Sequence, residues 1–266
     1  MFPSTAVRYL KLTWELAKIN LKVAMEYRIS FLIKVFGMVI NDVALVVVWV
    51  IFFQRFPEIN GWRIEDTILL FAIGTTSFGL VMTFGRAIHR ISRLISQGEL
   101  DHFLSFPVNV QWYVSLSEID VSAIGDLLFG LTIFFFSGNI SPEKFIMFSV
   151  FSATSAIILY NFSIIVQSMA FFVGNFEDAA DQFFHALLGF TLYPQTVFHG
   201  ALKIIMLTII PAFFMATLPV QLINDFKWDL FLILILFAVS TSFLSVAIFK
   251  KGLKRYESGN LMNVKT

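Results

Sequence analysis

Long apolar segments alternate with short polar ones along nearly the whole chain. Five of them are clear, at about residues 31–53, 67–84, 117–137, 145–173 and 229–249. A helix of about 20 apolar residues crosses the hydrocarbon core of a bilayer. The pattern therefore predicts an all-α, polytopic membrane protein.

The region between the fourth and the last of these segments is less regular. Residues 183–198 are apolar but short, and residues 204–223 are interrupted by Pro211 and Pro219. Proline removes a helical hydrogen bond and disrupts a continuous span. We therefore assign the crossing to 183–198 and expect residues 200–223 to form a re-entrant or outer-leaflet hairpin before the last span. A crossing by 204–223 remains the alternative.

Residues 5–28 predict an amphipathic helix. Trp14, Leu21 and Met25 fall on one apolar stripe, while Lys and Glu fill the other face. A helix of this kind lies in the membrane interface rather than across the bilayer.

The distribution of Lys and Arg predicts the orientation of the six spans. Thirteen of these residues fall in the segments expected to be cytoplasmic and five in the outer segments. Cytoplasmic loops carry an excess of Lys and Arg. Both the N-terminus and the C-terminus are therefore expected on the cytoplasmic side.

Composition agrees with the hydropathy pattern. Of 266 residues, 58% are hydrophobic and 14% are charged, against roughly 25% charged residues in soluble domains. The chain has no cysteine, which excludes disulfides and thiolate metal sites. We treat residues 1–266 as a single transmembrane domain.

Several polar residues lie inside the predicted spans. Polar and ionisable groups in lipid often mark a substrate pathway, although they also hold helices together. Asp126 lies inside the third span, where it could pair with Lys34 or with an arginine of the segment 86–107. The candidate pathway residues are Asn41, Asp42, Thr75, Thr76, Asn161 and Gln167.

The longest polar interruption in the first half of the chain is 86–107. Arg86, Arg90 and Arg93 are spaced by four and three residues, so they share one face of a helix. A basic helix between two spans is expected on the cytoplasmic surface. It is either a docking site for a soluble partner or an ordinary basic loop.

Familiar catalytic patterns are missing from the sequence. There is no G-x-x-x-x-G-K-[ST] phosphate loop and no H-E-x-x-H motif. The four histidines show no metal-ligand spacing. We expect no catalytic residue, metal, cofactor or nucleic acid on this chain, so any energy source must lie on a partner.

Two segments resemble motifs of a known family. The first resembles I-x-x-G-x-L-D-x-x-L-x-x-P and the second resembles YP…G-x-L…P…P. The first falls on Ile95, Gly98, Leu100, Asp101, Leu104 and Pro107, and the second on Tyr193, Pro194, Gly200, Leu202, Pro211 and Pro219. Over nearly its whole length the chain resembles the permease subunit of an ABC-2 type ATP-binding-cassette transporter, in the small branch of six-span half-permeases.

The resemblance implies partners and roles. Two permeases, identical or related, would associate with two cytoplasmic ATPase subunits that bind ATP and Mg. Residues 5–28 would be the connecting helix and residues 86–107 the coupling helix. The hairpin, with Tyr193, Pro194, Gly200, Pro211 and Pro219, would cap the outer side of the pathway. The expected ATPase contacts are Arg90, Arg93, Ile95, Gly98, Glu99, Leu100, Asp101, Leu104 and Pro107.

The function expected from this resemblance is export of a hydrophobic or amphipathic compound across the plasma (inner) membrane of a prokaryote. The mostly uncharged polar residues among many Phe and Ile favour such a substrate over an ion. Two alternatives stay open: a stand-alone channel or secondary carrier, and a membrane scaffold without transport activity. Co-purification with an ATPase would separate them.

Overall fold

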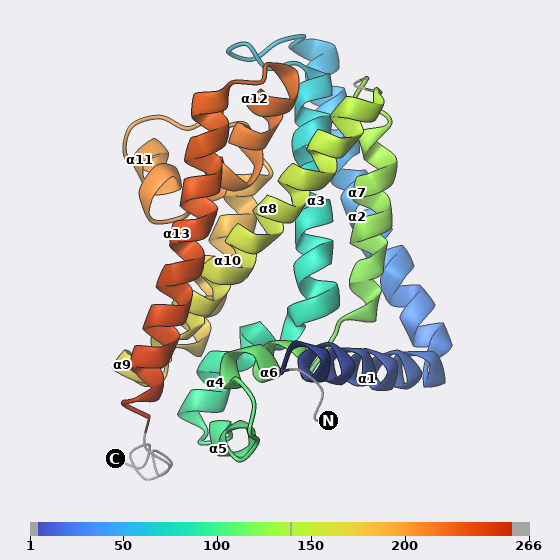
Figure 1. Cartoon of the computed structure of the whole chain (residues 1–266). Coiled ribbons are helices and arrows are strands. Elements are labelled where there is room, and N and C mark those ends of the chain that lie inside the picture. Colours follow the sequence, from blue (N-terminus) through green and yellow to red (C-terminus); the bar gives the residue numbers. More distant parts are fainter. Residues whose placement is uncertain (1–4, 139, 257–266) are drawn as a thin grey trace.

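The computed structural model describes residues 5–138 and 140–256, which form helices and connecting loops and no strand. The longest helices run lengthwise through a bundle, with shorter helices alongside them (Figure 1). One helix lies across an end of the bundle. The lengthwise helices are α2 (Arg28–Arg55), α3 (Ile64–Gly85), α7 (Ile124–Phe134), α8 (Pro142–Gln167), α10 (Glu177–Thr191) and α13 (Trp228–Leu253), and the crosswise helix is α1 (Thr5–Glu26).

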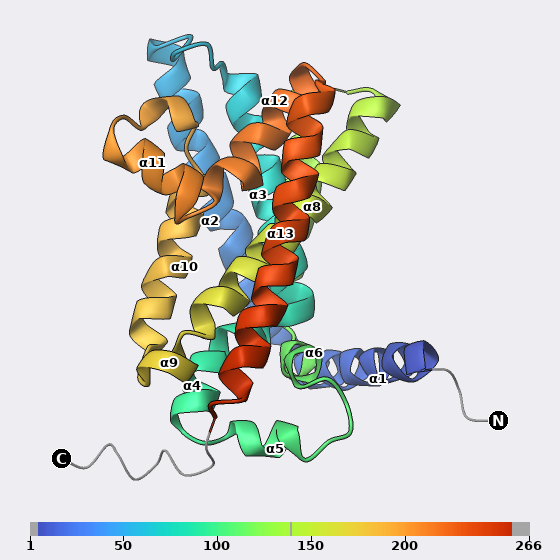
Figure 2. The ribbon, with the colours of Figure 1, turned by 60° about the vertical axis from the view of Figure 1, so that its left-hand side comes forward.

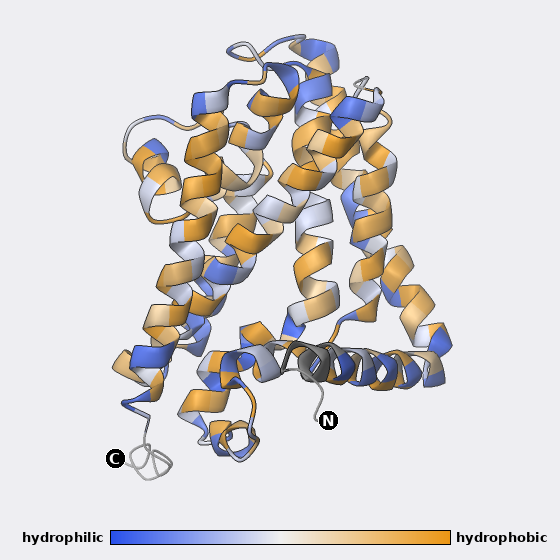
Figure 3. Cartoon of the chain, in the orientation of Figure 1, coloured by the Kyte–Doolittle hydropathy of each residue, from blue (hydrophilic) through white to orange (hydrophobic). Residues whose placement is uncertain are grey.

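Length and composition identify four stretches that can span a membrane. They are α2, α3 with its continuation to Ser96, α8 with its continuation through α9 (Ala170–Val173), and α13. A bent pair of helices near the C-terminus would make a fifth. Apolar residues cover the middle of the bundle and hydrophilic residues gather towards its ends (Figure 3). The chain is a multi-pass membrane protein, and its described residues contain four or five such candidates by length and composition.

Helix α3 forms the centre of the bundle. Most of its side chains are buried, whereas few of those of α2 and α13 are. Its contact with α7 is very close, since a Cβ atom on Gly130 would lie 2.2 Å from Oγ1 of Thr76. Small residues allow such close approach of helices in membranes.

The segment predicted as one coupling helix is broken. It consists of η1 (Arg86–Arg90), α4 (Ile91–Ser96) and α5 (Leu100–Leu104). The break falls at Gly98, whose φ of +73° is the left-handed conformation that glycine tolerates. The chain then returns to the bundle through α6 (Val110–Leu116), where the Asn109 side chain accepts a hydrogen bond from the Trp112 amide. The segment projects beyond the end of the bundle (Figure 2).

The third predicted span starts later than expected. Residues 117–120 are not helical, and the helix begins with η2 (Val121–Ala123) before α7. Asp120 ends the loop because its Oδ1 accepts a hydrogen bond from the Ser122 amide at 3.0 Å, which caps the new helix. Its own amide donates to the Met82 carbonyl oxygen at 3.0 Å.

The fifth predicted span, 183–198, is shifted towards the N-terminus. Helix α10 begins at Glu177, six residues before the predicted start, and ends at Thr191. Glu177 and Asp178 lie in its first turn, where negative charge stabilises a helix N-terminus. Pro194 follows shortly after its end, in keeping with the loss of a helical amide donor.

A bent helical segment follows in the range predicted as a hairpin. A short turn, η3 (Gln195–Val197), leads to α11 (Ala201–Thr208), then to a π-helical turn, η4 (Phe213–Thr217), and α12 (Leu218–Asn224). The two arms are bent by 69°. They lie towards the end of the bundle opposite α1 (Figures 1 and 2).

Candidate transport pathway and coupling surface

A cavity of about 600 Å³ opens between α2, α3, α7 and α10. Three of the six candidate pathway residues line it: Asn41, Asp42 and Thr75. Lys34 and Asp126, which the sequence marks as unusual without assigning them to the pathway, line it as well. Polar groups from four helices therefore meet at this one cavity. The remaining polar lining residues are Arg86, Asp120, Ser122 and Thr191.

Asp42 and Asp126 lie close to one another inside this cavity. Their exposed fractions are only 7% and 4%, and their carboxyl groups are close enough for one to hydrogen-bond to the other when they share a proton. The Oδ2 atom of each lacks a hydrogen-bond partner. Among the described residues, neither carboxyl group has a cation within 4.0 Å. The suggested pairing of Asp126 with Lys34 or a nearby arginine is absent from the structure.

The other three candidate pathway residues are held in helix contacts. Thr76 lies against Gly130. Asn161 Nδ2 donates to Ser242 Oγ at 2.9 Å, and its Oδ1 accepts from Ser245, which joins α8 to α13.

Gln167 joins α8 to α4 in a similar way. Its Oε1 accepts from the Ser92 amide at 2.9 Å, and its carbonyl oxygen accepts from Ser92 Oγ at 2.9 Å. The alternative of helix packing, left open by the sequence, therefore describes Thr76, Asn161 and Gln167 best.

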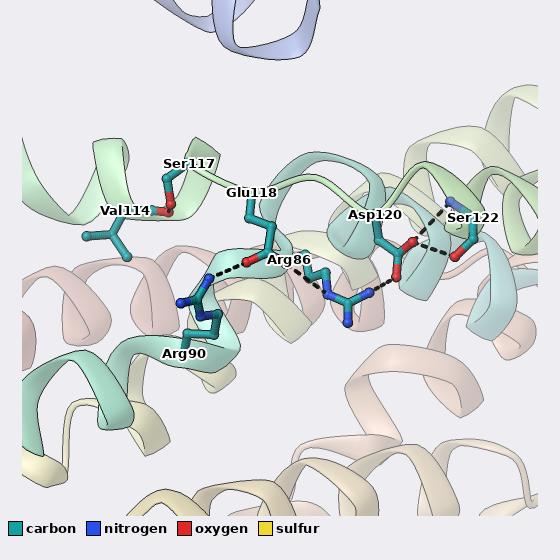
Figure 4. Close-up of polar contacts among 7 residues, drawn as sticks. All are labelled: Arg86, Arg90, Val114, Ser117, Glu118, Asp120 and Ser122. Carbon is teal, nitrogen blue, oxygen red and sulfur yellow. Dashed lines mark hydrogen bonds and ion pairs between the residues drawn. The ribbon is translucent and has the colours of Figure 1, made fainter. Parts of the chain in front are cut away.

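An ion-pair cluster forms the end of the cavity on the α1 side. Arg86 pairs with Asp120 and also contacts Glu118 at 3.7 Å (Figure 4). Arg90 Nη1 donates to Glu118 Oε2 at 2.6 Å. The cluster therefore ties η1, which follows α3, to the loop that precedes α7. No motif in the sequence indicates this pairing, because the partners lie 34 and 28 residues apart.

The expected ATPase contacts divide by exposure. Arg93, Glu99, Leu104 and Pro107 are exposed, and Gly98 and Asp101 are half-buried. Arg90 is exposed but engaged with Glu118.

Ile95 and Leu100 are the two residues of this set that cannot present their side chains. Their exposed fractions are 2% and 0% because they pack into the hydrophobic core. They hold the segment against the bundle, which corrects the expectation that they face a partner. A second hollow of about 440 Å³ lies in this segment, lined in part by Arg90, Glu99 and His102.

The end of α13 reaches the same segment. Burial, followed by the charge of Asp101, raises the pKa of the Tyr256 phenol to about 12. The Tyr256 ring also lies 6.2 Å from the ring of Phe171. The C-terminal end of the last helix is therefore packed beside α5, a contact that no motif in the sequence indicated.

The residues predicted to form the hairpin lie at or near the ends of the short helices between residues 193 and 219. Tyr193 packs edge-on against Trp49 of α2 with ring centroids 5.5 Å apart. Gly200 has a φ of +59° immediately before α11. Pro211 follows the end of α11, and Pro219 lies in the first turn of α12. Pro194 separates α10 from η3.

A family model described as "ABC-2 family transporter protein" matches residues 11–259. The chain belongs to the ABC-2 transporter family. As an ABC-2 protein it is a membrane permease subunit of an ABC transporter, and its partners are ABC ATPase subunits. No curated protein and no solved structure matches the chain.

Proposed function

We propose that this ABC-2 permease is one half of an exporter that moves hydrophobic or amphipathic compounds across the plasma membrane of a prokaryote. A second permease, identical or related, would complete the pathway. ATP and Mg would bind to two ATPase subunits. The excess of Lys and Arg at the α1 end supports a cytoplasmic location for that end.

The proposal includes six spans, formed by α2, α3, α7, α8, α10 and α13. Two of them are short: the stretch Val121–Phe134 and α10, with 15 residues, reach only about 21–23 Å at 1.5 Å per residue. A hydrocarbon core is roughly 30 Å thick. The bent pair α11–α12 lies beyond the end of α10, so it would fill the outer part of the membrane that α10 leaves uncovered (Figure 2).

The observation that carries the proposal is the projecting segment Arg86–Pro107. Its first part packs into the core through Ile95, whereas the part around α5 projects beyond the bundle (Figure 2). This projecting part presents charged and apolar side chains together, with Leu104 and Phe106 each 41% exposed. Apolar side chains surrounded by charges are typical of a surface that another protein covers.

The projecting segment is also mechanically connected to two spans. It continues directly from α3, and Arg86 and Arg90 join it to the loop before α7. A partner that contacts this segment differently in its ATP-bound and ATP-free states would shift the permease between two conformations. ATP-driven movement would thus enter through this segment.

The test is ATPase stimulation in a reconstituted complex. Arg93→Glu is the cleaner change because Arg93 is exposed and its Nε donates to Gln97 of the same segment, at 3.1 Å. Asp101→Arg is the second change. Each is expected to lower stimulated ATP hydrolysis about tenfold by replacing attraction with repulsion at the docking surface.

Asp229→Arg is the matched control, since Asp229 is exposed in the first turn of α13 at the opposite end of the bundle. Unchanged stimulation in both test variants, with normal membrane insertion, would rule out the coupling role. A chain that purifies without an ATPase and conducts ions as a closed oligomer would support the channel alternative instead.

A further inference from the structure

Among the described residues, the carboxyl pair Asp42–Asp126 has no cation to balance it. Asp42 lies near the middle of α2, about 20 Å from either end of that helix at 1.5 Å per residue. Charged groups at such depth are costly and usually face a partner or a functional cavity. Both carboxyl groups face the cavity of about 600 Å³.

Other buried polar groups of this chain show what a packing role looks like. Asn161 bonds to Ser242 and Ser245, and Gln167 bonds to Ser92. Each aspartate likewise has a buried Oδ2 atom without a hydrogen bond, as Gln167 has at its Nε2 atom. The aspartates differ from Gln167 because they are acids, and a buried charge without a cation costs far more than a buried neutral amide. Two acids brought together in the middle of a membrane protein are poorly suited to holding helices together.

The cations near the cavity do not supply the missing partner. Arg86 is committed to Asp120 and Glu118. Lys34 is exposed and lies eight residues before Asp42 on α2, about 12 Å away along the helix axis. Neither reaches within 4.0 Å of Asp42 or Asp126. Within the part of the chain that the structure describes, no positive charge is therefore placed to balance the pair.

We infer that the cavity binds an organic monocation with an apolar body, and that its cationic group lies between Asp42 and Asp126. This inference rests on the proposed transport function and names the substrate class for the same cavity. One bound cation together with one shared proton would make the pair neutral. The apolar body would contact lining residues such as Leu45, Phe78, Leu188 and Met215.

The dimensions and the donor set favour an organic cation over a metal ion. Small-molecule sites commonly measure about 300–1,000 Å³ and are mostly apolar with a few placed polar groups. A Ca²⁺ ion would require roughly six to eight oxygen ligands. Among the described residues no cluster of three or more His, Cys, Asp or Glu side chains is present to hold a metal.

The test compares two ions of similar size and opposite charge. Tetraphenylphosphonium and tetraphenylborate are titrated separately against the full-length chain in lipid nanodiscs, with empty nanodiscs as the blank. The cation is expected to bind saturably and the anion is not. Asp42→Asn and Asp126→Asn should each weaken cation binding about tenfold, since each leaves only one of the two carboxyl groups between which the cation lies.

The double variant should abolish saturable binding, and Asp229→Asn, on the exposed end of α13, should leave it unchanged. Asparagine preserves shape, and a melting curve for each variant verifies folding. Equal binding of both ions, or wild-type cation affinity in the folded double variant, would overturn the inference.

Co-purification with an ATPase is measured on the same variants. If the ATPase assembles normally but the affinity for the cation does not depend on the two aspartates, only the inference fails. If the cation binds through the aspartates while no ATPase associates, the proposed function fails and the binding site stands.

Discussion

Two charged regions of the permease border the same cavity and are built in opposite ways. At the α1 end, Arg86 and Arg90 are paired with Asp120 and Glu118. Deeper in the bundle, Asp42 and Asp126 lie together without a cation. In the first region each acid is paired with an arginine of the same chain. In the second region the two acids have no such cation among the described residues.

The difference separates structural charges from candidate functional ones. The paired region joins two chain segments, so its purpose is visible in the contacts it makes. The acidic pair joins nothing by an ion pair, although its burial makes it more costly to maintain. A buried charge without an ion-pair partner in the chain is a better marker of ligand binding than a buried charge that has one.

The strongest way to disrupt both regions is Gly130→Leu. Helix α7 carries Asp126 and follows the loop that holds Asp120, and Gly130 allows it to lie directly against Thr76 of α3. A side chain there would push the helices apart and is expected to lower the free energy of unfolding by about 3 kcal/mol. Denaturation by sodium dodecyl sulfate in mixed micelles measures the change.

Gly189→Leu is the control for this substitution. Gly189 lies in α10, and nothing lies within 4 Å of the position a Cβ atom would take. Its effect should remain under about 1 kcal/mol, as for most surface changes. Similar losses in the two variants would contradict the importance of the α3–α7 contact.

The same isosteric substitution distinguishes the two regions directly. Asp120→Asn removes the charge that pairs with Arg86 but keeps an oxygen for the Ser122 amide. The Arg86 and Asp120 side chains are 48% and 14% exposed, so the loss should be about 1–2 kcal/mol, between that of surface and buried pairs.

Asp126→Asn should instead leave the free energy of unfolding unchanged or raise it by about 1 kcal/mol. It removes one of two facing acids and supplies an amide that can donate to Asp42. Unfolding titrations of both variants, run side by side without added ligand, provide the measurement. Equal destabilisation by the two substitutions would show that the acidic pair has a structural role after all.

Hydropathy was sufficient to predict a helical, multi-pass protein, because apolar length is a property of single segments. It also placed the bent helices at 200–223, where Pro211 and Pro219 interrupt the pattern. The limits of the third and fifth spans were wrong. Local capping by Asp120 and the acidic first turn of α10 override the hydropathy pattern there.

The composition of the cavity was harder to predict. Asn41, Asp42 and Thr75 were chosen because they are polar within apolar spans, and the same reasoning chose Thr76, Asn161 and Gln167. Only tertiary packing separates the two groups, since hydrogen-bond partners such as Ser92 and Ser245 lie more than 70 residues away in sequence. The meeting of Asp42 with Asp126 likewise depends on how α2 packs against α7.

Salt concentration offers the finest distinction between the two regions. Screening shortens from roughly 30 Å at 0.01 M salt to roughly 3 Å at 1 M, and it acts mainly on exposed charges. The coupling energy of Arg86 and Asp120, from a double-mutant cycle of Arg86→Gln and Asp120→Asn, should therefore fall by about 0.5 kcal/mol over this range. The corresponding coupling of Asp42 and Asp126 should change much less because both carboxyl groups are buried. A strong salt dependence of the acidic pair would mean that solvent ions reach it freely, and the electrostatic contrast between the regions would then be lost.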